Sequence, residues 1–344
     1  MEKIRVQLKE NSYDVLFENG ELDKVAVCVR PLVKGENVMI VTDDNVAGLY
    51  LERVKKSFLA QGFKTFETVV SNGEKFKTPD TYLQIINALA KENFLRSDTV
   101  VALGGGVVGD MAGFAATTYM RGVNFVQIPT TLLAMIDSSV GGKVGVDLPE
   151  GKNLLGAFYQ PKLVFVDVKT LDTLPEREWQ NGLGEGLKYA LLDGGRIFEI
   201  MDAKSVRENI GEFVALCVKY KANIVEQDEK ESGLRRLLNL GHTIGHAIEK
   251  ASGFCVSHGE AVKFGLNFIL QASKKLGGDE KDLKKAGDLL AKYDADCKYN
   301  ARDILPLVKN DKKAEENNIN AVFVRRIGDC YVKKLGFREF ENLF

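Results

Sequence analysis

The stretch DTVVALGGGVVGDMAGFAA, residues 98–116, decides the fold class of this chain of 344 residues. An apolar run typical of a buried β-strand ends at three consecutive glycines, and residues with helical character follow. Gly104, Gly106 and Gly109 match the pattern G-x-G-x-x-G, which lets the backbone approach a pyrophosphate at a helix N-terminus. The alternative interpretation is a tight strand-to-helix turn without a ligand, because this motif alone has low specificity.

Two features set this loop apart from the usual dinucleotide fingerprint. It follows a late strand rather than the first strand of the domain. In addition, no acidic residue ends a strand about 20 residues further on, where a ribose partner is expected. If a dinucleotide binds here, another segment must hold its adenosine end, and the polar loop SNGEKFK, residues 71–77, offers Glu74 and Lys77 for that role.

Outward from this loop, the first half of the chain alternates β-rich runs with helical stretches. Helices are predicted at 45–62 and 78–94, and strands at 37–44, 65–70, 98–106, 124–131 and 162–168. Alternation of this kind is typical of a parallel sheet covered by helices. The sequence therefore predicts an α/β N-terminal domain with a parallel sheet and a Rossmann-like nucleotide site.

After about residue 170 the pattern becomes mostly helical. Helices are predicted at 207–227, 241–252, 258–276 and 279–293. Strands return only at 321–324 and 330–334, after a polar stretch that is typical of a loop. We therefore expect two domains, residues 1–170 and residues 171–344, of which the second is mostly α-helical.

Composition limits the classes of function. The formal net charge is -1, which gives no general attraction to nucleic acid or to anionic membranes. No apolar run approaches the roughly 20 residues of a membrane span, and the N-terminus has no apolar signal core. The five cysteines form neither a zinc pattern nor a disulfide framework, so a reducing, cytoplasmic location is expected.

Every histidine of the chain lies in the stretch LNLGHTIGHAIEKASGFCVSHGE, residues 238–260. His242 and His246 are four residues apart and share one face of a helix, and His258 opens the next helix. The spacing resembles H-E-x-x-H, but Thr243 stands where a zinc protease has its general base, which excludes that class. Such a cluster, with no histidine elsewhere, favours a functional site over three separate structural roles.

A catalytic zinc ion usually takes three protein ligands and leaves one position open. Three histidines satisfy that rule, and so do two histidines with a carboxylate. The candidate carboxylate is Glu185, in the glycine-punctuated helical start NGLGEGLKYA at 181–190, with Lys188 one turn later. The alternative interpretation of Glu185 and Lys188 is an exposed ion pair on a helix.

The segment 129–158 sets small polar and charged residues among apolar ones. Its members that need partners or ligands if buried are Asp137, Ser138, Lys143, Lys152 and Asn153. Other segments add Arg121, Lys188, Lys221, Arg235 and Asn239. This set suits a substrate with a phosphate and a carboxylate, because arginine binds anions bidentately and lysine supplies point charges. Any single member is also compatible with a solvated surface residue.

Together, these motifs resemble the 3-dehydroquinate synthase family of the shikimate pathway, which belongs to the sugar phosphate cyclases. The resemblance covers nearly the whole chain. Its motifs, in order, are NGEKFK (72–77), GGGVVGDMAGFAA (104–116), QIPTTLLAMIDSSVGGK (127–143), EGKNLLGAFYQP (150–161), GLGEGLKYA (182–190), EKESGLRRLLNLGHTIGHAIE (229–249), SHGEAV (257–262) and NDKK (310–313).

The resemblance implies that the α/β domain carries NAD and that the helical domain carries Zn²⁺, with Co²⁺ as an alternative. It also implies a homodimer and an active site in the cleft between the domains. No nucleic acid or membrane partner is expected, because of the near-zero net charge and the lack of a long apolar run. Glu185, His242 and His258 would be the metal ligands. His246 would then be an acid/base group beside Arg235 rather than a ligand.

The resemblance also implies the contacts of the cofactor and the substrate. The NAD contacts are Asn72, Gly73, Glu74, Lys77, Gly104, Gly105, Gly106, Val107, Val108, Gly109, Asp110, Thr130, Thr131, Asp137, Lys143, Lys152, Thr170, Leu171, Asp172 and Thr173. The substrate contacts are Asp137, Lys143, Asn153, Lys188, Lys221, Arg235, Asn239, His246 and one of Lys312 or Lys313. Arg121 matches a position that reaches the substrate phosphate from the neighbouring subunit. The departures from the family pattern, at Gly186 and Ser257, remove no functional group.

The reaction that the resemblance implies is that of a carbon–oxygen lyase. It converts DAHP, a seven-carbon sugar acid phosphate, to 3-dehydroquinate and phosphate by transient NAD oxidation, phosphate elimination, re-reduction, ring opening and intramolecular aldol closure. Three alternatives compete with it. Another NAD- and zinc-dependent sugar phosphate cyclase would take a substrate without the carboxylate, a metal-dependent polyol dehydrogenase would release NADH, and a non-catalytic NAD-binding protein would lack the metal and proton-handling residues.

Overall fold

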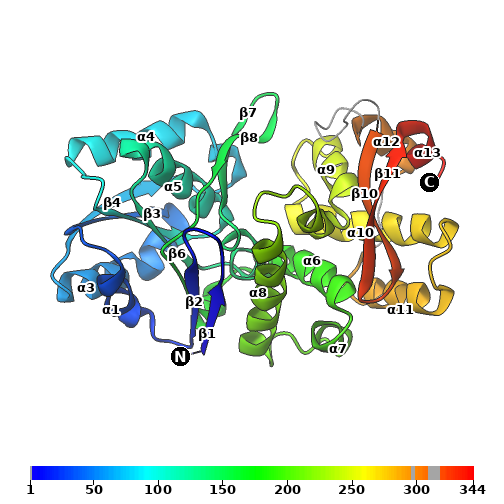
Figure 1. Ribbon diagram of the computed structural model, residues 1–344, viewed down its shortest axis with the longest axis horizontal. Helices are drawn as coiled ribbons and strands as arrows, with labels where there is room; N and C mark the ends of the chain where they lie inside the picture. Colours follow the sequence, from blue (N-terminus) through cyan, green and yellow to red (C-terminus); the bar gives the residue numbers. More distant parts are fainter. Residues whose placement is uncertain (1, 296–298, 309–317) are drawn as a thin grey trace. The chain divides into compact units, whose positions relative to one another are not determined.

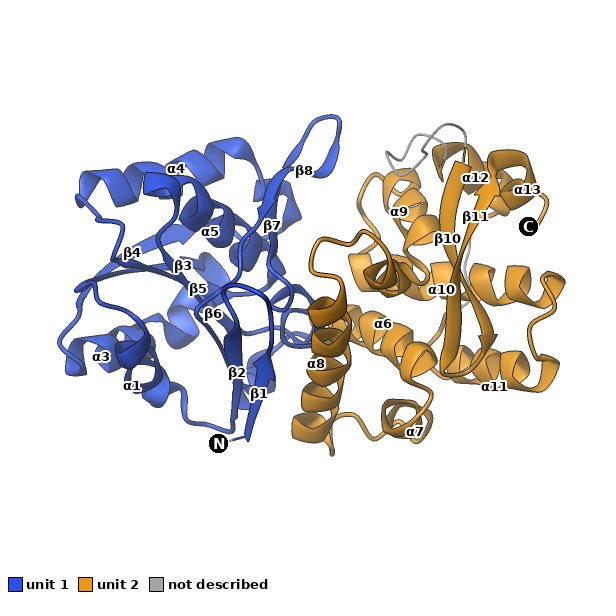
Figure 2. Ribbon diagram, in the orientation of Figure 1, with its two compact units in different colours: residues 1–175 blue, residues 176–344 orange. Residues whose placement is uncertain are grey.

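The computed structural model of the protein describes residues 2–295, 299–308 and 318–344. The chain forms two compact units, residues 1–175 and residues 176–344 (Figures 1 and 2). The domain boundary that the sequence predicts, at residue 170, falls within the short helix η7 (Val168–Thr173), a few residues before the end of the first unit. No helix among the described residues is both long and apolar enough to cross a membrane.

The first unit is built on a seven-stranded sheet in the order β1-β2-β9-β6-β5-β3-β4. All neighbouring strands pair in parallel except β1 and β2, which form an antiparallel pair at one edge. The strands are β1 (Glu2–Val6), β2 (Tyr13–Glu18), β3 (Asn37–Asp43), β4 (Lys64–Val70), β5 (Thr99–Gly104), β6 (Asn124–Pro129) and β9 (Leu163–Asp167). The predicted α/β class and parallel sheet are therefore confirmed.

Helices cover both faces of this sheet, because successive side chains of a strand point to opposite faces. On β3, Val38 and Ile40 pack in one core cluster with residues of α1 (Val25–Val29) and α3 (Glu52–Ala60). Met39 and Val41 pack in a second cluster with residues of α4 (Pro79–Lys91) and α5 (Gly106–Thr118) (Figure 1). Burial on both faces explains why the central strands are continuous apolar runs.

Shorter elements complete the first unit. They are α2 (Asp44–Val46), the hairpin strands β7 (Lys143–Leu148) and β8 (Gly151–Phe158), and the short helices η1 (Leu22–Lys24), η2 (Arg30–Leu32), η3 (Ala47–Leu51), η4 (Glu74–Phe76), η5 (Tyr119–Arg121) and η6 (Ala134–Ser138). The sequence pattern did not predict the β7–β8 hairpin. Gly145 lies opposite Gly156 in this hairpin, and such small residues weaken the alternation of apolar and polar side chains that marks a strand.

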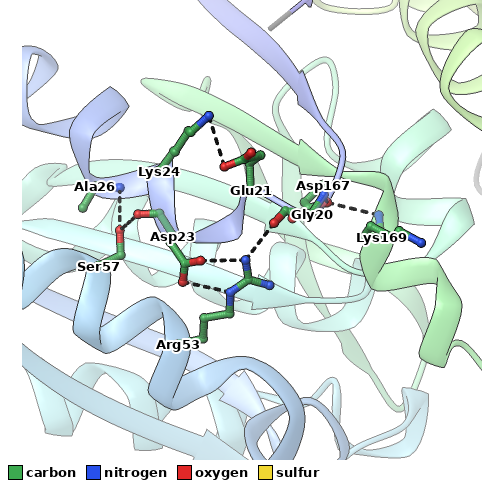
Figure 3. Close-up of polar contacts among 9 residues, drawn as sticks. All are labelled: Gly20, Glu21, Asp23, Lys24, Ala26, Arg53, Ser57, Asp167 and Lys169. Atoms are coloured by element: carbon green, nitrogen blue, oxygen red, sulfur yellow. Dashed lines mark hydrogen bonds and ion pairs between the residues drawn. The ribbon is translucent and has the colours of Figure 1, made fainter.

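A polar network holds the connection after β2 against α3 and β9 (Figure 3). The Arg53 guanidinium donates to the two carboxylate oxygens of Asp23, at 2.8 and 2.7 Å, and to the carbonyl oxygen of Gly20 at 2.9 Å. The Asp167 carboxylate accepts the backbone N–H groups of Gly20 at 2.7 Å and Lys169 at 3.1 Å. This network fixes the carboxyl end of β9, where the predicted cofactor segment 170–173 begins.

The strand order contains a topological switch point between β3 and β5. From β3 the chain passes through α3 to β4 on one side, and from β5 it passes through α5 to β6 on the other side. Ligands of open α/β sheets bind at the carboxyl ends of strands at such a point. The glycine loop at residues 104–106 lies at this position.

The second unit is mostly helical and carries one two-stranded antiparallel sheet among its described residues. Its helices are α6 (Glu176–Asp193), α7 (Arg196–Asp202), α8 (Ile210–Gln227), η8 (Leu234–Asn239), α9 (His242–Ala251), α10 (His258–Lys275), α11 (Glu280–Ala291), α12 (Ala301–Val308) and α13 (Phe337–Glu341). The sheet consists of β10 (Asn318–Arg326) and β11 (Asp329–Gly336). The four helices predicted from the sequence correspond to α8, α9, α10 and α11, and the two predicted strands lie within β10 and β11.

Candidate metal and nucleotide sites

Three helices of the second unit bring a carboxylate and two histidines together. Glu185 lies on α6, His242 begins α9 and His258 begins α10. The Nε2 atoms of His242 and His258 lie 3.3 and 3.1 Å from the same carboxylate oxygen of Glu185, Oε1. One ligand atom from each of the three residues lies within 4.8 Å of the others, which is a geometry suited to a metal ion.

Two glycines allow α6 and α10 to approach closely enough for this cluster. A Cβ atom added to Gly184 would lie 1.9 Å from the carbonyl oxygen of Gly259. One added to Gly259 would lie 1.7 Å from the carbonyl oxygen of Asn181. The Asn181 side chain also accepts the Gly259 N–H at 2.7 Å, which caps the start of α10. The residues beside these glycines, Glu185 and His258, are thereby held next to each other.

Glu185 lies in the middle of α6, not at a helical start as the sequence pattern suggested. Its ion pair with Lys188 is also not an exposed one. The carboxylate is fully buried, the Lys188 side chain is 1% exposed, and Nζ lies 2.5 Å from Oε2 of Glu185. The exposed-pair interpretation is therefore wrong, and the pair is part of the interior of the cluster.

The electrostatics of the cluster favour a cation. Burial by itself raises the pKa of the Glu185 carboxyl, but Lys188 and the two histidines hold it well below its usual range. Burial lowers the pKa of His242 to about 4, so this imidazole is neutral at pH 7. Burial also disfavours protonated His258, but hydrogen bonds to Glu185 and Glu249 outweigh it and raise the pKa to about 10. Glu185 and Glu249 stabilise the positive charge of a proton on His258, and their negative charge would stabilise a metal cation at this position in the same way.

The Glu185 carboxylate also fits a metal ligand by its surroundings. Its Oε2 atom is paired with Lys188, and its Oε1 atom faces the Nε2 atoms of both histidines. A buried carboxylate needs cationic partners, and a divalent cation at Oε1 would be one. One carboxylate with two imidazoles is a donor set that zinc accepts in catalytic sites.

The third histidine, His246, completes the cluster on α9. Its ring centroid lies 5.5 Å from that of His242 and 6.0 Å from that of His258. The chain reaches α9 from η8, which carries Arg235 and Asn239, through Gly241 in the left-handed conformation (φ 80°). Arg235 and Asn239, which were predicted as substrate contacts, therefore lie in the turn that leads directly into the histidine-bearing helix α9.

The loop before η8 is organised by Asp228. Its carboxylate accepts the N–H groups of Ser232 at 2.9 Å, Gly233 at 2.7 Å and Arg235 at 2.9 Å. Burial by itself would raise the pKa of Asp228, but the hydrogen bonds from these donors outweigh it and lower the pKa to about 2. Downstream, the Asn239 amide donates to Glu231 at 2.6 Å. Asp228 and Glu231 were not among the predicted residues, although both stand in or next to the motif EKESGLRR.

The glycine loop of the first unit presents an uncapped helix N-terminus. Gly105 is the N-cap residue of α5, and no side chain caps it. A Cβ atom added to Gly105 would lie 3.0 Å from Thr131 Cγ2, and one added to Gly106 would lie 3.0 Å from Ser138 Oγ. The first-turn N–H groups of α5 therefore form a cradle for an anion such as a pyrophosphate.

The adenosine-end candidates form a network with the β7–β8 hairpin. Lys77 is 4% exposed, and its Nζ lies 2.6 Å from Asp110 Oδ2 and 2.5 Å from Asn153 Oδ1. Burial opposes the charge on Lys77, but the surrounding carboxylates, Asp110 first, raise its pKa above the usual value. Lys152 Nζ pairs with Glu74 at 3.1 Å. The structure thus joins Lys77, predicted for NAD, to Asn153, predicted for the substrate.

Two further segments lie at carboxyl ends of the sheet. Tyr50 donates to the Thr170 carbonyl oxygen at 3.1 Å and lies 2.5 Å from Thr173 Oγ1, which anchors the segment 170–173. Asp44, directly after β3, accepts the N–H group of Asn72 at 3.2 Å. Asp44 was not among the predicted residues, although an acidic residue at the end of a strand is a known signal for a ribose partner.

The remaining predicted residues are more scattered. Asp137 lies on η6, Lys143 begins β7 with an exposed side chain, and Thr130 donates its N–H group to the Gly104 carbonyl oxygen at 3.0 Å. Arg121 is exposed on η5, beyond the C-terminal end of α5 and away from its glycine loop. Lys221 is buried on α8. The choice between Lys312 and Lys313 lies outside the described residues.

Solved structures with a similar fold define the class of protein. This chain resembles ValA, a 2-epi-5-epi-valiolone synthase from Streptomyces hygroscopicus subsp. jinggangensis whose structure has NAD⁺ and Zn²⁺ bound. The two superpose with a TM-score of 0.86 and 27% identity, over 98% of this chain and 97% of that one. A 2-deoxy-scyllo-inosose synthase shares the fold with a TM-score of 0.89 and 24% identity over 99% of both chains. The fold is that of the sugar phosphate cyclases.

Sequence comparison identifies the family within that class. The family models "3-dehydroquinate synthase N-terminal" and "3-dehydroquinate synthase C-terminal" match residues 67–181 and 182–314. The 3-dehydroquinate synthase of Clostridium acetobutylicum is 41% identical over 98% of both chains. That of Clostridium perfringens is 42% identical over 99% of this chain and 100% of its own. The chain belongs to the 3-dehydroquinate synthase family, as the sequence motifs predicted.

Proposed function

We propose that this chain catalyses the 3-dehydroquinate synthase reaction, as a phosphate-eliminating carbon–oxygen lyase that acts on DAHP with NAD and a divalent metal ion. The observation that carries the proposal is the group of Glu185, His242 and His258, whose ligand atoms lie within 4.8 Å of one another in a chain of this family. Over the whole cycle the hydride taken from the substrate is returned to it, so NADH does not accumulate.

The metal would be held by Glu185, His242 and His258. When bound, a zinc ion would supply Lewis-acid chemistry, which favours loss of a proton from a hydroxyl group and polarises a carbonyl group. Lys188 sets the charge of the ligand group: its ammonium at 2.5 Å keeps the Glu185 carboxylate ionised in a fully buried position.

NAD would bind to the first unit at the switch point of its sheet. The uncapped N-terminus of α5 supports a pyrophosphate contact, and the lysine–carboxylate network around Lys77 supports a contact at the adenosine end. The proposed contacts are those that the family resemblance implies, from Asn72 to Thr173, with Asp44 as an addition.

The chain's own side chains would hold the substrate and move its protons. Lys188, Lys221 and Arg235 are buried cations suited to the phosphate and carboxylate of DAHP. His246, close to the metal ligands but outside their group, would act as an acid/base, and its neighbours would orient the open-chain intermediate for aldol closure. Arg121 would act from a neighbouring subunit in a cytoplasmic homodimer.

The alternative within the same class is another NAD- and zinc-dependent sugar phosphate cyclase. The substrate carboxylate distinguishes the two, and the buried Arg235 favours DAHP because a guanidinium can bind a carboxylate bidentately. Identity to 3-dehydroquinate synthases also exceeds identity to the solved cyclases, at 41% against 27%.

The testing experiment is an assay of the purified protein with DAHP, NAD and Zn²⁺. We expect equimolar phosphate and 3-dehydroquinate, no net rise in absorbance from NADH, and loss of both products with a chelator. A hexose 6-phosphate, which lacks the carboxylate, is the matched control substrate. Turnover of the control and not of DAHP would contradict the proposal in favour of the other cyclases, and accumulation of NADH would favour a dehydrogenase.

A further inference from the structure

Glu249 is a buried carboxylate to which the proposed mechanism gives no role. It lies on α9, one turn after His246, and is 2% exposed. Its Oε2 atom lies 3.5 Å from Nδ1 of His258. Carboxylates are seldom buried to this extent unless they are paired, so a contact with a histidine at a candidate metal site is informative.

The two candidate histidine ligands are oriented in the same way. Nδ1 of His242 lies 3.1 Å from the carbonyl oxygen of Leu240, and Nδ1 of His258 faces Glu249. In both residues Nε2 faces Oε1 of Glu185. An acceptor beside Nδ1 keeps the proton on that nitrogen, so the lone pair of each ring lies on Nε2, where a metal ion would be bound.

A second set of residues, His246, Glu249 and His258, also has ligand atoms within 4.8 Å of one another. It shares His258 with the set that contains Glu185. One imidazole can bind a metal through Nε2 while its Nδ1–H donates to a carboxylate, so the two overlapping sets are explained by a single ion and a carboxylate behind one of its ligands.

We propose that Glu249 is a positioning residue: it accepts the Nδ1–H of His258 and thereby fixes the tautomer and the ring orientation of that metal ligand. The inference rests on the metal site of the proposed function. A carboxylate acceptor also makes Nε2 a stronger donor to the metal than the Leu240 carbonyl makes His242. Glu249 itself does not contact the metal.

The test measures Co²⁺ binding to the metal-free full-length protein by competition with a chromophoric chelator. We expect one Co²⁺ per chain for the parent. We expect Glu249→Gln to weaken Co²⁺ binding about 10- to 100-fold and to change the visible spectrum of the bound ion. Glu249→Asp, whose carboxylate is one methylene further away, should also weaken binding. Glu212→Gln, which removes an exposed carboxylate paired with Arg196 in the same unit, is the matched control and should bind as the parent does.

Melting curves with and without Co²⁺ separate a positioning role from a structural one. A ligand raises the melting temperature according to its affinity, so Glu249→Gln should show a smaller Co²⁺-induced rise than the parent. An equal loss of stability in the metal-free and loaded protein, with an unchanged rise, would overturn the inference. So would equal affinity in Glu249→Gln and the parent, or two Co²⁺ ions per chain. If the parent binds no Co²⁺, it is the metal site of the proposed function that fails.

Discussion

The candidate nucleotide site and the candidate metal site use different chemical groups. In the first unit, the glycine loop at residues 104–109 offers the backbone N–H groups of an uncapped helix N-terminus. In the second unit, the cluster of Glu185, His242 and His258 offers buried, ionisable side chains. The difference suits the two proposed ligands: a pyrophosphate is bound by dipoles that come close to it, and a metal ion is bound by lone pairs on three converging atoms.

Glycines occur in both sites, but they have different neighbours. In the loop, an added Cβ would meet side chains, such as Thr131 at Gly105. In the cluster, an added Cβ at Gly184 or Gly259 would meet the backbone of another helix at less than 2 Å. A side chain can turn aside, whereas a helix backbone must move as a whole. The metal site should therefore be the more sensitive of the two to a single methyl group.

The largest expected effect comes from removing a ligand. His242→Ala should abolish metal binding and lower turnover by roughly 1,000-fold or more, because a three-ligand site loses one donor. NAD binding by calorimetry should persist. His246→Ala is the matched comparison: it should retain the metal and lose about 100-fold or more in rate, since it removes a proton-transfer group. A metal-free His246→Ala protein would overturn the division of roles between these histidines.

The second prediction concerns the helix crossing that assembles the cluster. Gly259→Ala places a Cβ 1.7 Å from a backbone oxygen, so α6 and α10 must separate. We expect a loss of about 3 kcal/mol in unfolding free energy, at the upper end of overpacking costs, and weaker Co²⁺ binding. Gly211→Ala, where a Cβ meets nothing within 4 Å in the helix α8, is the control and should be neutral or stabilising. Equal stability of the two variants would show that the close approach is not required.

The third prediction tests the backbone site. Gly109→Ala places a Cβ 2.8 Å from Gln127 Oε1, a buried side chain on β6, and so shifts the start of α5. We expect about a tenfold rise in the Kd for NAD, measured by calorimetry, with unchanged metal content. Gly48→Ala, with nothing within 4 Å, is the control in the same unit. A loss of metal in Gly109→Ala would break the comparison, because the two sites would not be independent.

The smallest expected effect concerns the loop before the histidines. The Asp228 pKa of about 2 lies below the usual value of about 3.9, so its contribution to stability is present above pH 3.9 and is lost as the pH falls towards 2. Asp228→Asn should cost about 1 kcal/mol at pH 7 in urea unfolding. The difference from the parent should shrink between pH 4 and pH 2. A difference independent of pH would assign the effect to packing rather than to the charged hydrogen bonds.

Some helices, strands and site residues were predictable from the sequence pattern, and others were not. Strands β3, β4, β5, β6 and β9 and helices α8 to α11 were predicted because buried strands and amphipathic helices leave periodic patterns in the chain. The hairpin β7–β8 was not predicted, and of the 18-residue α6 only a helical start at 181–190 was, because glycines interrupt the pattern in both. Glu185 was predicted as a ligand candidate, but at a helical start. The alternative of an exposed pair with Lys188 stayed open, since burial of an i, i+3 pair is not visible in a local pattern.

By itself, the sequence determined the α/β class, the positions of the strands and helices with clear periodicity, the family, and the identity of the residues available to bind a metal or a pyrophosphate. Only the tertiary structure decided which of these residues meet. It brought Glu185 to His258 through glycines at a helix crossing, set Glu249 behind His258, and set Asp44 beside Asn72. The physical reason is that periodicity and motifs are properties of neighbours along the chain, whereas convergence depends on how closely distant backbones pack.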